Sequence, residues 1–152
     1  MIITRRLRGP RRLVATASLG VLAASQLMIG VWALFAPEHF FAAFPSSGHA
    51  WVALLPPYNE HLVRDVGALS LALAVVLVSA AVTADRLLVR VAACAFAVYA
   101  LPHTLFHGLH LHGFALGDAV AQMGGFVLQL GLVAAALLST RRPTPGDDHE
   151  DR

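Results

Sequence analysis

Four long apolar runs, separated by polar joints, dominate the pattern of this chain. They predict membrane spans at about 13–35, 62–82, 87–106 and 119–138. Each run has close to the roughly 20 residues that an α-helix needs to cross a hydrocarbon layer about 30 Å thick. The fold class expected is therefore all-α: a four-helix transmembrane bundle with up-and-down topology, over residues 13–140. Little of the chain remains for a separate soluble domain.

The polar joint after the first run contains helix-ending and interfacial residues. Pro37 ends the first helix, because proline cannot donate the backbone hydrogen bond that a helix interior needs. A short amphipathic stretch follows at 38–44, and it is expected to lie on the membrane surface. Trp51 and Tyr58 favour the headgroup level of a bilayer. Asn59 is suited to cap the second span, because its side-chain oxygen can accept a hydrogen bond from the first turn.

Arginine predicts the orientation, because short cytoplasmic loops collect basic residues. If both termini are cytoplasmic, ten of the 11 basic residues lie inside and only Arg64 lies outside. The segment 1–12 is then a basic cytoplasmic N-terminus, and 141–152 a disordered cytoplasmic tail.

The first run has 23 residues, longer than the roughly 7–15 of a signal-peptide core, so an uncleaved span is expected. The chain is predicted to be a multi-pass protein of the cell inner (plasma) membrane.

Composition supports this class and excludes others. Apolar residues make up 57% of the chain and charged residues 13%, against about 25% charged in soluble domains. The net charge of +2 is too small to indicate nucleic-acid binding. The lone Cys94 excludes an internal disulfide, and it is expected to be a buried small apolar residue. The absence of lysine, with an excess of alanine and valine, indicates a GC-rich bacterial genome.

The head of the second span carries a charged cluster. Helical spacing places Glu60 over Arg64 and His61 over Asp65, each at i,i+4. Charges at the membrane edge usually face the bundle or water, so these four residues, with Asp118, are the predicted ligand-binding residues. The alternative is a self-neutralised cluster that only anchors the helix end.

The end of the third span carries the predicted metal ligands. His103 and His107 are one turn apart, so both rings share one helix face. Two such histidines form half of a site for zinc or another divalent metal, and a third ligand must come from elsewhere. Haem or quinone is expected less than a divalent metal. For haem the reason is that its ligands in a bundle normally face each other across two helices. The alternative is a pair of interfacial histidines bound to each other and to water.

Two motifs carry a resemblance to a known group. The segments Tyr58–Gly67 and Pro102–His107 resemble those of the DoxX-like group of small four-helix bacterial membrane proteins, and more closely those of a mostly actinobacterial branch. The resemblance covers about residues 13–140 and implies the four-helix fold. Some DoxX members are associated with quinone-linked oxidation, but no motif here carries that activity over residue by residue.

Three functions follow as hypotheses. The first is a membrane protein that binds a small ligand or metal at an outward-facing cluster of histidines and carboxylates. In this hypothesis the charged head of the second span is expected to meet His103 and His107 in space. The second is a membrane redox subunit acting on quinone, with Arg64 or a histidine holding the quinone oxygen. The third is a structural partner subunit without a site. The expected surroundings are the lipid bilayer and a homo-oligomer or membrane partner subunit, with no nucleic acid. Whether the protein is an enzyme is left open.

Overall fold

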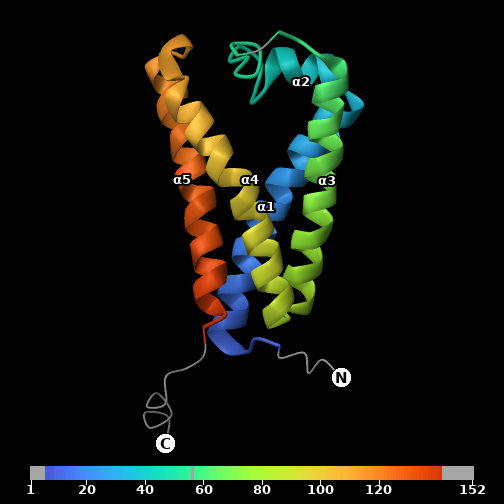
Figure 1. Cartoon of the computed structure of the whole chain (residues 1–152), viewed down its shortest axis with the longest axis vertical. Coiled ribbons are helices and arrows are strands. Elements are labelled where there is room, and N and C mark those ends of the chain that lie inside the picture. Colours follow the sequence, from blue (N-terminus) through green and yellow to red (C-terminus); the bar gives the residue numbers. More distant parts are fainter. Residues whose placement is uncertain (1–5, 56, 142–152) are drawn as a thin grey trace, which may run out of the picture.

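The computed structural model describes residues 6–55 and 57–141, and this part of the chain is helical. It contains four helices long and apolar enough to cross a membrane, which confirms the all-α prediction. Each of them contains the span predicted at its place in the chain. Figure 1 shows them as α1 (Gly9–Phe35), α3 (Glu60–Thr83), α4 (Arg86–Leu109) and α5 (Leu116–Ser139).

Two short helices lie in the joints: α2 (Pro37–Ala43), and a 3-10 turn at Leu111–Gly113. The α2 helix matches the predicted amphipathic stretch, and it buries Phe40 against the Trp32 ring, with 5.7 Å between ring centroids. The side chain of Asn59 accepts a hydrogen bond from the backbone N–H of Leu62, which confirms the predicted cap of α3. The predicted disordered tail lies, apart from Arg141, outside the described residues.

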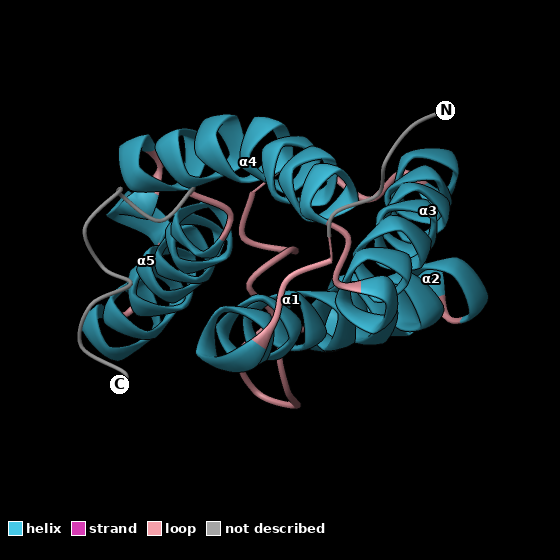
Figure 2. Cartoon of the chain, turned by 90° about the horizontal axis from the view of Figure 1, so that it is seen from below, coloured by secondary structure: helices cyan, strands magenta, loops and turns pink. Residues whose placement is uncertain are grey.

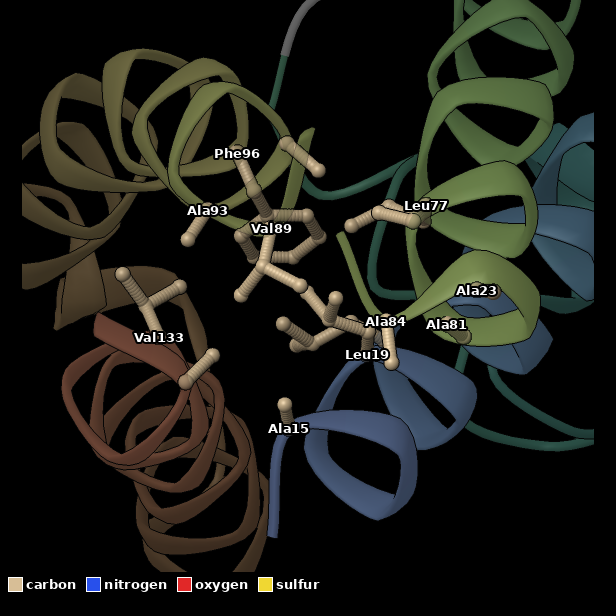
Figure 3. Close-up of a cluster of buried hydrophobic side chains, with 14 of the residues drawn as sticks. Ala15, Leu19, Ala23, Leu77, Ala81, Ala84, Val89, Ala93, Phe96 and Val133 are labelled. Atoms are coloured by element: carbon tan, nitrogen blue, oxygen red, sulfur yellow. The ribbon is translucent and has the colours of Figure 1, made fainter. Parts of the chain in front are cut away.

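The start of α1 and the end of α5 lie at the same end of the bundle, here called the terminal end (Figure 1). The packed core lies in this half, where the helices approach closely through alanines and a few larger side chains. Figures 2 and 3 show the four helices around it. Leu19, Leu77 and Phe96 are completely buried there. Small residues permit this close packing, because helix association in a membrane depends on close contact between helices.

Polar contacts also tie the terminal end together. The guanidinium of Arg90 on α4 donates to the hydroxyl and the carbonyl oxygen of Thr140, both at 2.9 Å. The guanidinium of Arg11 donates to the carbonyl oxygen of Arg141 at 2.8 Å. The backbone N–H of Leu7 donates to the carbonyl oxygen of Ala84. The arginines thus satisfy carbonyl groups that a helix C-terminus leaves without partners.

The opposite end, here called the loop end, is wider. In Figure 1, α4 and α5 diverge from α1 and α3 towards this end, and the segment after α2 lies between the two pairs. α1 and α3 stay in contact, because glycines allow their backbones to approach. A Cβ added at Gly67 would lie 2.5 Å from the backbone nitrogen of Leu34, and one at Gly30 would lie 2.8 Å from the Leu71 side chain.

The outer faces of the long helices expose large apolar side chains. On α4, Val91 is 50% exposed and Val98 is 75% exposed. Cys94 lies between them on the same face and is exposed. The expectation of a buried cysteine is therefore wrong, because an apolar surface facing lipid accepts a small apolar residue as readily as a core does.

Candidate functional site

A cavity of about 740 Å³ lies at the loop end, between the two diverging helix pairs. Small-molecule sites usually have volumes of about 300–1,000 Å³. All the helices contribute to its wall, and so does the loop after α2. Most lining residues are aromatic or aliphatic. Its polar lining residues are Asn59, Tyr99, His103, His107, His110, His112, Gln122 and Gln129. This cavity is called the histidine pocket below.

The histidines of α4 form a contiguous row along the pocket. The ring centroids of His103 and His107 are 4.5 Å apart, and the Tyr99 ring stacks on His103 at 5.2 Å. Nδ1 of His107 lies 3.1 Å from Oε1 of Gln122 on α5, a hydrogen bond in which the ring N–H donates. This bond places the proton of a neutral ring on Nδ1 and leaves Nε2 as an acceptor.

Aromatic rings surround these polar groups. The Phe126 ring of α5 lies 5.2 Å from the His103 ring and 5.1 Å from the His107 ring, measured between centroids. Phe106 stacks on His110 at 4.1 Å. The imidazole rings therefore lie in an apolar setting, where a hydrogen bond to a ligand is stronger than in water.

The loop after α2 covers the histidine pocket. Trp51, Val52 and the neighbouring leucines line it from this side. Nδ1 of His49 lies 2.7 Å from Oδ1 of Asp118 at the start of α5. This contact joins two segments that are 69 residues apart, and it attaches the loop to the far side of the pocket. Asp118 thus holds the loop and does not line the histidine pocket.

The charged head of α3 forms the two predicted i,i+4 pairs. Arg64 donates to Glu60 from two of its nitrogens, each at 2.8 Å. It also donates to the backbone carbonyl of Leu34 on α1. Nε2 of His61 lies 3.4 Å from Oδ2 of Asp65. Exposed pairs of this kind contribute about 0–1 kcal/mol each.

The residues predicted as one site lie at two places. Glu60 and Arg64 line a separate cavity of about 330 Å³, beside Glu38 and His39. Within the part of the chain that the structure describes, neither of them lines the histidine pocket, and the same holds for His61 and Asp65. The α3 residues that line it instead are Asn59, Leu62, Val63 and Val66.

Helix rotation explains this division. Positions 59, 62, 63 and 66 follow the i, i+3, i+4, i+7 spacing of one helix face, while 60, 61, 64 and 65 lie on the other.

The predicted metal site needs ligands besides His103 and His107. In residues 6–55 and 57–141, no group of three or more His, Cys, Asp or Glu side chains is arranged to hold a metal ion. A metal at His103 and His107 therefore stays a prediction that needs further ligands from water or a second molecule.

Sequence reasoning missed several residues of the pocket. One face of α5 carries Gln122, Phe126 and Gln129 at i, i+4 and i+7. Polar residues at this spacing inside a span were the sequence feature that could have indicated a binding site on α5. Trp51 was interpreted only as an interfacial residue. His49 carried no signal, because its partner lies far away in the sequence.

Comparison with known proteins gives no match. No family model, curated protein or solved structure matches this chain significantly. The DoxX-like resemblance thus remains a prediction from the two sequence motifs, and any function must be argued from the geometry.

Proposed function

We propose that this chain is a multi-pass membrane protein that binds a small amphipathic molecule in the histidine pocket. The observation that carries the proposal is a row of histidines and glutamines inside a large, otherwise apolar cavity. Binding sites combine apolar walls with a few placed polar groups in this way, because the walls supply affinity and the polar groups fix orientation. Polar groups within spans are costly and usually functional.

The ligand is expected to have a hydrocarbon body and a hydrogen-bonding head. The head binds the row formed by His103, His107 and Gln122, and the body contacts apolar residues such as Leu62 and Val66 on α3. The proposal moves the predicted ligand site from the charged head of α3 to the histidines of α4. Asp118 and Glu60 keep structural partners instead.

The proposed topology is up-and-down with both termini in the cytoplasm, so the loop end faces outwards. The arginines at the terminal end support it through the positive-inside rule. A reporter that works only in the cytoplasm is expected to be active when fused after Arg142 and silent when inserted after Ser47. A reporter that works only outside the cytoplasm serves as the control and should give the reverse pattern. The same reporter activity at both sites, or the opposite pattern, would overturn the orientation.

Trp51 provides a direct test of ligand binding. The chain has two tryptophans. Trp51 lines the histidine pocket, and Trp32 does not. In the variant Trp32→Phe, in lipid nanodiscs, a brominated long-chain alcohol is expected to quench Trp51 fluorescence saturably, because bromine quenches only at short range. Excess unlabelled hexadecanol should restore the fluorescence, since the two alcohols compete for one site.

The matched control is Trp51→Phe, which leaves Trp32 as the only tryptophan. Trp32 packs against α2, where its indole N–H donates to Nδ1 of His39. Quenching of Trp32 should rise in proportion to the alcohol dissolved in the bilayer, without saturation or competition. If Trp51 behaves in the same non-saturating way, the pocket does not bind amphipathic molecules and the proposal fails.

A further inference from the structure

We infer that the histidine pocket selects an amphipathic acid, such as a long-chain carboxylic acid, over an amine with the same chain. This inference rests on the proposed function and names its ligand class. The argument has two parts: the charges available in the pocket, and the place where the acidic head would bind.

The described lining of the pocket contains histidines and Tyr99 as its only ionisable side chains, with no aspartate, glutamate or arginine. The ionisable side chains come from α4 and the turn that follows it, while α1, α2, α3, α5 and the loop after α2 contribute only uncharged residues. Three nearby carboxylates have other partners, as the pairs His49–Asp118, Glu60–Arg64 and His61–Asp65 show. Glu38 lines the separate cavity beside Arg64 and not this pocket. No lining side chain can therefore become an anion that neutralises a bound ammonium group at neutral pH.

An acid meets the opposite situation. Its O–H can donate to the free Nε2 of His107, whose Nδ1 is held by Gln122. If the proton moves to the ring instead, the result is an imidazolium paired with a carboxylate. At neutral pH the acid is ionised in water, because its carboxyl group resembles a glutamate side chain with a pKa of about 4.3, so it takes up one proton from solution as it binds. The acid and the ring together then carry no net charge in either arrangement. His103 is adjacent, with 4.5 Å between the two ring centroids, and can donate to the second oxygen of the acid.

An ammonium group in the same place would have no counter-charge. The faces of aromatic rings attract a cation by only about 0.5–2 kcal/mol, which is less than the cost of burying an unpaired charge. Removing a charge from water without a counter-charge is strongly unfavourable. The amine could enter only after losing its proton, which costs free energy at neutral pH because an ordinary alkylamine resembles a lysine side chain with a pKa of about 10.4. An alcohol needs no change of protonation, so it serves as the uncharged reference. The expected order of affinity is the acid before the amine.

Competition against the brominated alcohol tests this order. Palmitic acid, hexadecanol and hexadecylamine are added to the Trp32→Phe protein in nanodiscs, and each is compared by its mole fraction in the bilayer. The acid is expected to restore Trp51 fluorescence at a mole fraction at least about tenfold lower than the amine, a difference of about 1.4 kcal/mol. Equal potency of acid and amine, or a more potent amine, would overturn the inference.

Histidine variants show whether the preference arises at this site. His107→Gln and His103→Gln, made separately, keep a polar group and remove the ionisable ring, so the ratio of acid to amine potency should fall towards one. The ratio is insensitive to a general loss of affinity or of folded protein. His39→Gln, which changes a histidine outside the pocket, should leave it unchanged. An unaltered ratio in both pocket variants would count against the inference.

The outcomes also separate the inference from the proposed function. If the brominated alcohol quenches saturably but acid and amine compete equally, the pocket binds amphipathic molecules without this preference. If the alcohol does not quench saturably, the proposed function fails and the acid preference fails with it.

Discussion

Replacing Gly67 with alanine is expected to destabilise the bundle by about 1–3 kcal/mol, the usual cost of overpacking a close contact. The new Cβ would lie 2.5 Å from the backbone nitrogen of Leu34 and 2.9 Å from its Cα. Backbone atoms cannot rotate away as a flexible side chain can. α1 and α3 would have to separate, which also disturbs the hydrogen bond from Arg64 to the Leu34 carbonyl.

The matched control is Gly20→Ala on α1, where an added Cβ meets nothing within 4 Å. Both changes replace glycine with alanine inside a helix, so both gain about 1 kcal/mol of helix propensity. Thermal unfolding in detergent, followed by circular dichroism, should show a lower midpoint for the Gly67 variant and an equal or higher one for the control. Similar midpoints in the two variants would mean that the close crossing of α1 and α3 does not limit stability.

Replacing Gly125 with leucine is expected to weaken binding of the brominated alcohol roughly 10- to 100-fold. Gly125 lines the histidine pocket on α5, and a Cβ there meets nothing within 4 Å. The leucine side chain can therefore occupy the cavity without disturbing the helix. A ligand forced against it bears an overpacking cost of about 1–3 kcal/mol, and each 1.4 kcal/mol is about tenfold in affinity.

Gly124 provides the control for this variant. It is the preceding residue on the same helix, it is exposed, and its added Cβ also meets open space. It does not line the pocket. Gly124→Leu should therefore leave the saturable quenching of Trp51 unchanged. An equal loss in the two variants would indicate a general effect on α5, and no loss in Gly125→Leu would place the ligand elsewhere.

The features that the sequence predicted correctly are local. Span length and hydropathy depend on one contiguous segment, so the four long helices could be located without knowing their neighbours. The Asn59 cap involves only the first turn of α3. The pairs Glu60–Arg64 and His61–Asp65 follow from helical spacing alone.

The location of the site was a different problem, as α3 shows. The polar face with Glu60 and Arg64 was expected to join the histidines of α4, but the apolar face with Leu62 and Val66 lines the pocket. In a soluble protein an apolar face predicts the inward side of a helix. In a membrane protein lipid is as apolar as a core, so hydropathy does not tell the inward face from the outward one.

By itself, then, the sequence determined that this chain forms four helices able to span a membrane, and it located the ends of these helices to within a few residues. It also determined which side chains at the head of α3 form i,i+4 pairs. Only the tertiary structure decided how each helix is rotated, that the bundle is packed at one end and open at the other, and that His49 meets Asp118 across the pocket. The physical reason is the distance along the chain over which each interaction acts. Backbone hydrogen bonds and hydropathy act within one segment, whereas the pocket arises from the packing of segments far apart in the chain.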